Sequence, residues 1–275
     1  MDFDSIDWNA LWQKEAHRPD GDDAKSQKER WDKRADKYEK RPQGERDKND
    51  YITQMLDRIE VKPDWSVLDI GSGPGILALP LARRAASVTA LDISSEMLRR
   101  LEANAAKSDI ENVRCINASW QDAFARGEVA GHDVVVASRS LMAGNMKEAV
   151  TRFHETARQA VYLTLPVVHL PFDWEVHQAI GRKKRKHPPF VYIYNMLFQM
   201  GIFADVEILR SRIKVQFSSV NEAIEDLQWR TEPFTDEELE KLREYLGTPK
   251  VLTHESNSIW ALITWRKDTG DVFLG

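Results

Sequence analysis

The chain has 275 residues, of which 42% are hydrophobic and 30% are charged, and its formal net charge at pH 7 is -5. This length fits one large domain with additions, and the apolar fraction allows a substantial core. The acidic balance excludes a protein that attracts polyanions with its whole surface, so binding of nucleic acid would need a local basic patch.

The sequence predicts a cytoplasmic protein. No run of about eighteen apolar residues is present, so we expect no membrane span. Residues 1–5 lack the basic and apolar regions of a signal peptide. Cys115 is the single cysteine and has no intramolecular disulfide partner, which suits a reducing compartment.

The N-terminal 60 residues are charged and contain few periodic stretches. Residues 6–12 predict one face of a short helix, and residues 18–23 predict a loop. Trp31, Ala35 and Tyr38 recur at helical spacing within a charged surface helix. A further helix is expected over residues 51–59.

The next region alternates between short apolar strands and helices. A strand at 66–70 runs into a turn with Gly71, Gly73 and Gly75, and a helix at 76–84 leads to a strand at 87–92 that ends in Asp92. Ile76 occupies the third glycine position of the dinucleotide fingerprint G-x-G-x-x-G. The turn therefore favours a nucleoside over a pyrophosphate, with the carboxylate of Asp92 on the ribose hydroxyls.

The alternation continues with a helix at 95–106, strands at 113–116 and 133–137, a helix at 147–159 and a strand at 160–165. This order predicts a doubly wound α/β domain. Residues 166–189 have no clean period and predict an insertion over the strand ends. A helix is expected at 190–200, two long strands at 205–217 and 258–267, and helices at 220–229 and 235–246 between them.

The stretch from Val67 to Gly75, together with Asp92, resembles the D-x-G-x-G-x-G motif of class I S-adenosylmethionine-dependent methyltransferases. The resemblance implies a seven-stranded, mostly parallel sheet of the Rossmann-like methyltransferase fold, whose final strand is antiparallel. It implies S-adenosylmethionine as the cofactor and S-adenosylhomocysteine as the product. It also implies an N-terminal helical lid at 1–60 and a methyltransferase domain at 61–275, with a cap for the substrate at about 166–200.

Residues at the strand ends and in the lid are the expected cofactor contacts. Asp92 has an alternative role as a helix cap, and Met97 and Trp120 have alternative roles as packing residues. Asn117 stands where the family usually has an acid that binds the adenine amino group, and Asp122 is a second candidate for that contact. The full set is Tyr38, Asp69, Gly71, Ser72, Gly73, Asp92, Ile93, Met97, Asn117, Ala118, Ser119, Trp120 and Ser138.

Catalytic residues are less defined by the sequence. His169 follows the fifth strand and is a candidate general base, although methyl transfer from a sulfonium requires mainly positioning. His169, Asp173 and His177 are four residues apart, but Pro171 should interrupt a helix there, so we expect no metal site. C5-methylation of pyrimidines needs a cysteine nucleophile near the fourth strand, and Cys115 lies in the third. The N-P-P-Y motif of base amino-methyltransferases is also absent.

Three functions fit these features. The first is methyl transfer to a small-molecule substrate, in which Arg139 either binds an anionic group or simply pairs with a nearby acid or caps a helix. The second is an RNA methyltransferase that binds nucleic acid through the basic run at 182–187. The third is a non-catalytic sensor of S-adenosylmethionine. The oligomeric state is not predicted.

Overall fold

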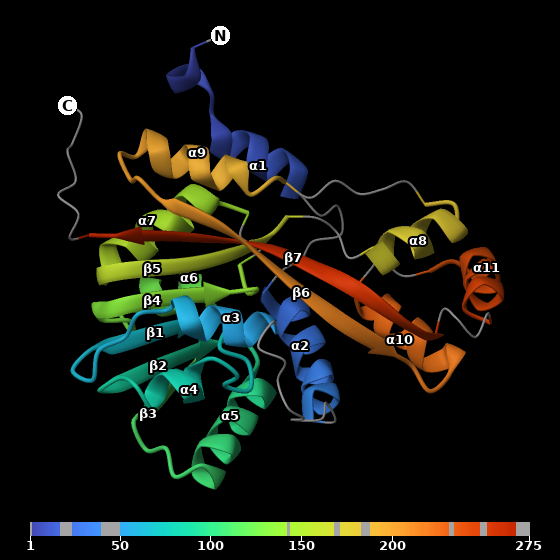
Figure 1. Cartoon of the computed structure of the whole chain (residues 1–275), viewed down its shortest axis with the longest axis horizontal. Helices are drawn as coiled ribbons and strands as arrows, with labels where there is room; N and C mark the ends of the chain where they lie inside the picture. Colours follow the sequence, from blue (N-terminus) through green and yellow to red (C-terminus); the bar gives the residue numbers. More distant parts are fainter. Residues whose placement is uncertain are drawn as a thin grey trace.

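A computed structural model describes residues 2–16, 24–39, 50–141, 144–167, 171–182, 188–230, 234–247 and 252–267. Its centre is a seven-stranded sheet with the order β3-β2-β1-β4-β5-β7-β6 (Figure 1). The strands are β1 (Ser66–Ile70), β2 (Ser87–Asp92), β3 (Val113–Asn117), β4 (His132–Ser138), β5 (Ala157–Pro166), β6 (Asp205–Gln216) and β7 (Thr253–Arg266).

The first five strands pair in parallel, and β7 pairs antiparallel with both β5 and β6. The expected seven-stranded, mostly parallel sheet with an antiparallel final strand is therefore confirmed. Connections reverse direction between β1 and β4, because the chain winds outward to β3 and then returns past β1. Ligands of such sheets bind outside the carboxyl ends of the strands at this switch point.

Helices cover both faces of the sheet. The helices are α1 (Trp8–Ala16), α2 (Ala24–Glu39), α3 (Tyr51–Arg58), α4 (Ala78–Ala82), α5 (Ser95–Lys107), α6 (Trp120–Ala125), α7 (Met146–Thr156), α8 (Pro171–Ala179), α9 (Val191–Gln199), α10 (Val220–Arg230) and α11 (Asp236–Leu246), with a 3₁₀ turn at Phe3–Ser5. Within the described ranges, none is long and apolar enough to cross a bilayer.

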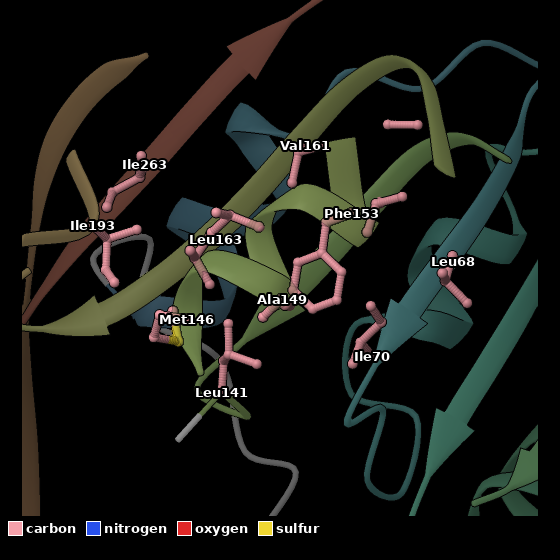
Figure 2. Close-up of a cluster of buried hydrophobic side chains, with 14 of the residues drawn as sticks. Leu68, Ile70, Leu141, Met146, Ala149, Phe153, Val161, Leu163, Ile193 and Ile263 are labelled. Atoms are coloured by element: carbon pink, nitrogen blue, oxygen red, sulfur yellow. The ribbon is translucent and has the colours of Figure 1, made fainter. Parts of the chain in front are cut away.

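Strand residues alternate between two cores. Leu68 and Ile70 of β1 join Phe153 of α7 and Ile193 of α9 on one face, as Figure 2 shows. Val67, which directly precedes Leu68, joins the opposite core with residues of α3, α4 and α5. Strands β1, β2, β4 and β5 are thus largely buried on both faces, which explains their continuous apolar sequences.

A smaller apolar cluster lies beyond the end of the sheet. It joins Val176 and Ile180 of α8 and its border to residues of α10 and α11, including Leu227 and Leu242. Figure 1 shows these helices beside the far end of the β6–β7 hairpin, toward the side to which β4 points. This cluster lies on the same side of the molecule as the ligand-binding edge of the sheet.

Pro171 begins α8, because proline is tolerated in a first turn that needs no N–H donor. The expected interruption of a helix through His169 stays a prediction, because His169 lies outside the described residues. Several predicted boundaries are wrong. Helix α4 covers only 78–82 of the expected 76–84, since the glycine turn continues to residue 77. Strand β7 begins at Thr253 and extends further along β6 than predicted.

Candidate cofactor and acceptor site

The glycine turn after β1 lies against the segment that follows β4. Gly71, Gly73 and Gly75 have φ angles of 72°, 55° and 86°, a region that favours glycine. A Cβ at Gly71 would lie 2.1 Å from the Cβ of Ser140, so only glycine fits there. A Cβ at Gly73 would meet no atom within 4 Å. The turn therefore leaves room beside the backbone of Gly73.

Asp92 ends β2 directly beside this turn. Its Oδ2 accepts a hydrogen bond from the Gly73 N–H at 2.8 Å, and its Oδ1 accepts one from the Ser94 N–H at 2.8 Å. Each oxygen retains a second acceptor position. The side chain of Ser94 caps α5 by accepting from the Met97 N–H. Because Ser94 fills the capping role, the remaining acceptor positions of Asp92 suit two vicinal hydroxyl groups.

Asp69 is a buried carboxyl group within β1 and is 2% exposed. Burial, helped by the nearby negative charge of Asp92 and opposed by the Ala78 N–H, raises the pKa of Asp69 to about 7. Burial also raises the pKa of Asp92. A cationic ligand group would stabilise the ionised forms of both acids, so this pair favours a ligand that carries positive charge.

Ser72 supplies a buried hydroxyl group that lacks a protein partner. Its Oγ has no hydrogen-bond partner among the described residues, although most buried polar groups are paired. The hydroxyl of Ser72, the space at Gly73 and the acceptors of Asp92 fit a nucleoside with a cationic amino-acid tail. S-adenosylmethionine has this composition, so the residues present fit that cofactor.

Asn117 and Ala118 connect the end of β3 to the end of β2. The Nδ2 of Asn117 donates to the carbonyl oxygens of Asp92 and Ile93, at 3.1 Å each. The Ala118 N–H donates to the carbonyl oxygen of Asp92 at 3.1 Å. These expected cofactor residues are therefore brought together beside Asp92, and the adenine contact of Asn117 stays a prediction.

Ser119, Trp120 and Met97 have structural contacts of their own. Ser119 caps α6 by accepting from the Asp122 N–H. The ring of Trp120 packs edge-on against Phe153 with ring centres 5.9 Å apart, and Met97 is 2% exposed. These contacts match the packing alternatives for Trp120 and Met97, and direct contact of the three residues with the cofactor stays a prediction.

Ser138 ends β4, on the opposite side of β1 from Asp92. The hydroxyl of Tyr51, at the start of α3, lies 2.7 Å from the Oγ of Ser138 and 2.7 Å from the Oγ1 of Thr164. The Tyr51 ring also packs against Trp260 of β7, with centres 5.8 Å apart. Tyr51 was expected only as the first residue of a helix, and no local pattern indicates this contact.

Helix α2 is attached to the start of α5. The carboxylate of Asp32 accepts from the Ser94 hydroxyl at 2.6 Å and from the Glu96 N–H at 3.3 Å, and it pairs with Lys28 at 2.6 Å. Burial by itself would raise the pKa of Asp32, but the hydrogen bonds from Lys28 and Ser94 hold that pKa below its ordinary value. Asp32 thus brings α2 within two residues of Asp92.

Three expectations lie outside the described residues. His169, the candidate general base, is in a segment whose structure is not described. Tyr38 lies in α2, but its side chain is not described, whereas Ala35 on the same predicted face is buried. Of the basic run at 182–187, only Arg182 is described.

Cys115 lies inside β3 and is half-buried. Burial and the nearby Glu102 raise the pKa of the thiol to about 11. The thiol is therefore protonated at neutral pH, and a protonated thiol is a poor nucleophile.

Comparisons with known proteins identify relatives of this chain. A family model described as a methyltransferase domain matches residues 67–160. An uncharacterized protein of Haemophilus influenzae is 30% identical over 244 residues, which cover 87% of this chain and 89% of that protein. A 23S rRNA (uracil-C5)-methyltransferase of Alkalilimnicola ehrlichii is 37% identical over 67 residues, which cover 24% of this chain and 15% of that protein.

A solved structure from Bacillus halodurans C-125, provisionally assigned as a methyltransferase, has a TM-score of 0.55 and 14% identity. The aligned region covers 79% of this chain and 98% of the Bacillus halodurans chain. At 14% identity this similarity supports the fold alone. The family match begins in β1 and ends in β5, so it contains the glycine turn and Asp92. The chain belongs to the class I methyltransferase family and is an S-adenosylmethionine-dependent methyltransferase.

Proposed function

We propose that this enzyme methylates a small-molecule acceptor bound outside the carboxyl ends of β4 and β5. One observation carries the proposal: N-terminal helices are attached to the ligand-binding edge at two places. Asp32 of α2 hydrogen-bonds Ser94 near the cofactor turn, and Tyr51 of α3 hydrogen-bonds Ser138 and Thr164. Helices over this edge limit the size of the acceptor and exclude water.

The resulting roles are mainly those of binding and orientation. When bound, S-adenosylmethionine supplies a sulfonium methyl group, which forms a bond with an acceptor lone pair while the C–S electron pair returns to sulfur and leaves S-adenosylhomocysteine. Asp92 would hold the ribose, and Tyr51 fixes the side chains at the ends of β4 and β5. An acceptor atom that carries a proton must lose it, and His169 is our proposed base.

The N-terminal residues 1–60 would serve as the lid, and the segment at about 166–200 would serve as the cap over the acceptor. Helix α2 supports the first assignment, because Figure 1 shows it near α5 on the side to which β4 points. Helix α8 belongs to the apolar cluster at the same side of the molecule, which supports the second.

RNA is the second candidate acceptor, and the local similarity to an rRNA methyltransferase favours it. Two observations weigh against it. Arg182 is the first residue of the basic run, and its guanidinium makes two hydrogen bonds of 2.6 and 2.7 Å to Glu238. The positive charge of Arg182 is therefore neutralised within the protein. Cys115 has a raised pKa and lies within β3, which disfavours C5-methylation of uracil.

Label transfer tests the proposal. Purified enzyme is incubated with methyl-labelled S-adenosylmethionine and native cell extract, and the RNA, protein and small-metabolite fractions are counted. We expect label in the metabolites and none with the Asp92→Ala variant. Label in RNA would favour the second candidate, and charge reversal at Lys183, Lys184 and Arg185 should then abolish it. Tight cofactor binding without label in any fraction would indicate a sensor.

A further inference from the structure

Arg139 has an unusual backbone conformation at the end of β4. Its φ is +55°, and Asp109 is the other non-glycine residue with positive φ among those described. The Arg139 N–H donates to the Oγ1 of Thr164 at 3.0 Å, and the next residue, Ser140, donates from its Oγ to the carbonyl oxygen of Ile70 at 2.5 Å. Contacts to β5 and β1 thus hold the strained conformation, and such strain concentrates at functional sites.

The side chain of Arg139 is held by an aromatic surface. Its guanidinium carbon lies 4.3 Å from the ring centre of Tyr51. Tyr51 is 3% exposed and is fixed by hydroxyl contacts to Ser138 and Thr164. Stacking on a fixed ring orients a guanidinium before a ligand arrives.

The charge of Arg139 is available to a ligand. The residue is exposed, and no carboxylate in the described part of the chain pairs with its guanidinium. By contrast, Arg58 pairs with Glu207 and Arg182 pairs with Glu238. A planar guanidinium with free donors matches the two oxygens of a carboxylate or a phosphate.

Arg139 lies in the acceptor half of the site. Asp92 ends β2, Arg139 follows β4, and β1 lies between these strands. The contacts of Arg139 and Tyr51 reach Thr164 on β5 and Trp260 on β7, away from β2. A nucleoside on Asp92 would therefore extend toward β1, with Arg139 on the far side of the turn.

We propose that Arg139, stacked on Tyr51, binds a carboxylate or phosphate group of the methyl acceptor. This inference rests on the proposed function and assigns the acceptor to the class of small anionic molecules. The carboxylate of the cofactor's methionine offers the same chemistry, and the experiment must separate these two sources.

The binding test uses protein saturated with S-adenosylhomocysteine and calorimetric titration with benzoate, phenyl phosphate and neutral benzyl alcohol. Asn replaces Arg139 because asparagine tolerates positive φ, and Arg139→Lys keeps the charge. Arg152→Asn, an exposed site on α7, is the control. We expect one of the two anions to bind, at least about tenfold weaker binding in Arg139→Asn, intermediate binding in Arg139→Lys and unchanged binding in the control.

Binding of S-adenosylhomocysteine should change less than about twofold in Arg139→Asn, because Arg139 lies on the far side of the turn from Asp92. A tenfold loss there would assign Arg139 to the cofactor and overturn the proposal. It is also overturned if neither anion binds the wild-type protein more tightly than benzyl alcohol, or if the Asn variant binds both normally.

Label transfer separates this inference from the proposed function. The labelled metabolites are divided on an anion exchanger, and we expect the methylated product in the retained fraction. Label only in the unretained fraction would overturn the anionic acceptor but keep the small-molecule function. Absence of label from every metabolite fraction, in extract that supports labelling of RNA or protein, would overturn both.

Discussion

Asp69→Asn should stabilise the cofactor-free enzyme at pH 8 but not at pH 4. In the folded state the pKa of Asp69 is raised from 3.8 to about 7, mainly by burial and then by Asp92. A raised pKa means that the protonated carboxyl group favours folding. This stabilising contribution is fully present below pH 3.8 and is lost as the pH rises through about 7. A difference of about 3 in pKa corresponds to about 4 kcal/mol.

Urea denaturation of wild-type and Asp69→Asn protein, without cofactor, from pH 4 to pH 8 measures this effect. Asparagine retains an acceptor for the Ala78 N–H and carries no charge. We expect the free energy of unfolding of the variant to exceed that of the wild type by a difference that grows to about 4 kcal/mol at pH 8. A difference that does not depend on pH would refute the reasoning.

Asp133→Asn provides a control of opposite sign. Burial by itself would raise the pKa of Asp133. Hydrogen bonds from the backbone and side chain of Ser66, together with the charge of Arg158, nevertheless lower this pKa below its ordinary value. The stabilising contribution of Asp133 is present above its unfolded pKa and is lost as the pH falls through its lowered folded pKa. The Asp133→Asn variant should therefore lose stability relative to the wild type at neutral pH and approach it in acid.

Three further substitutions test the site and the apolar cluster beyond the sheet. Asp92→Ala should weaken binding of S-adenosylhomocysteine at least about 100-fold in calorimetry, since it removes two charge-assisted hydrogen bonds of about 1.5–3 kcal/mol each; unchanged affinity would disprove the ribose role. Gly71→Ala should destabilise the fold by more than about 2 kcal/mol in urea titrations, because the cost of positive φ for alanine and the cost of the steric clash with Ser140 add together. A second change, Ser140→Gly, should recover part of this lost stability. Arg182→Met should speed hydrogen exchange in α11 through loss of the pair with Glu238, whereas unaltered exchange would show that α11 does not depend on this pair.

The βαβ unit with the glycine turn and Asp92 was predictable because its signals are local. The strand at 66–70, the three glycines and Asp92 lie within 27 consecutive residues, and each glycine is required by positive φ. The apolar sequences of β1, β2 and β4 reflect burial on both faces, which also predicted the parallel sheet. The family match over residues 67–160 covers the same part of the chain.

The contacts of α2 and α3 with distant strands and helices were not predictable from local sequence. Asp32 and Ser94 are 62 residues apart, and Tyr51 and Thr164 are 113 residues apart. A single hydroxyl or carboxylate group that hydrogen-bonds a residue far away in the chain produces no helical or strand periodicity in the sequence. The expected helix at 51–59 was correct in type and nearly correct in extent, yet the periodicity that predicts a helix does not identify its partner.

This contrast explains why the donor was identified and the acceptor was not. The expected cofactor residues Asp69 to Gly73 and Asp92 belong to one βαβ unit, so the chain order and the spatial order agree. The surroundings of Arg139 come from β1, β4, β5 and α3, and they meet only when the complete sheet has formed. On the role proposed for Arg139, recognition of the acceptor depends on tertiary structure, and changes in α3 or β5 should alter acceptor choice while the glycine turn and Asp92 stay the same.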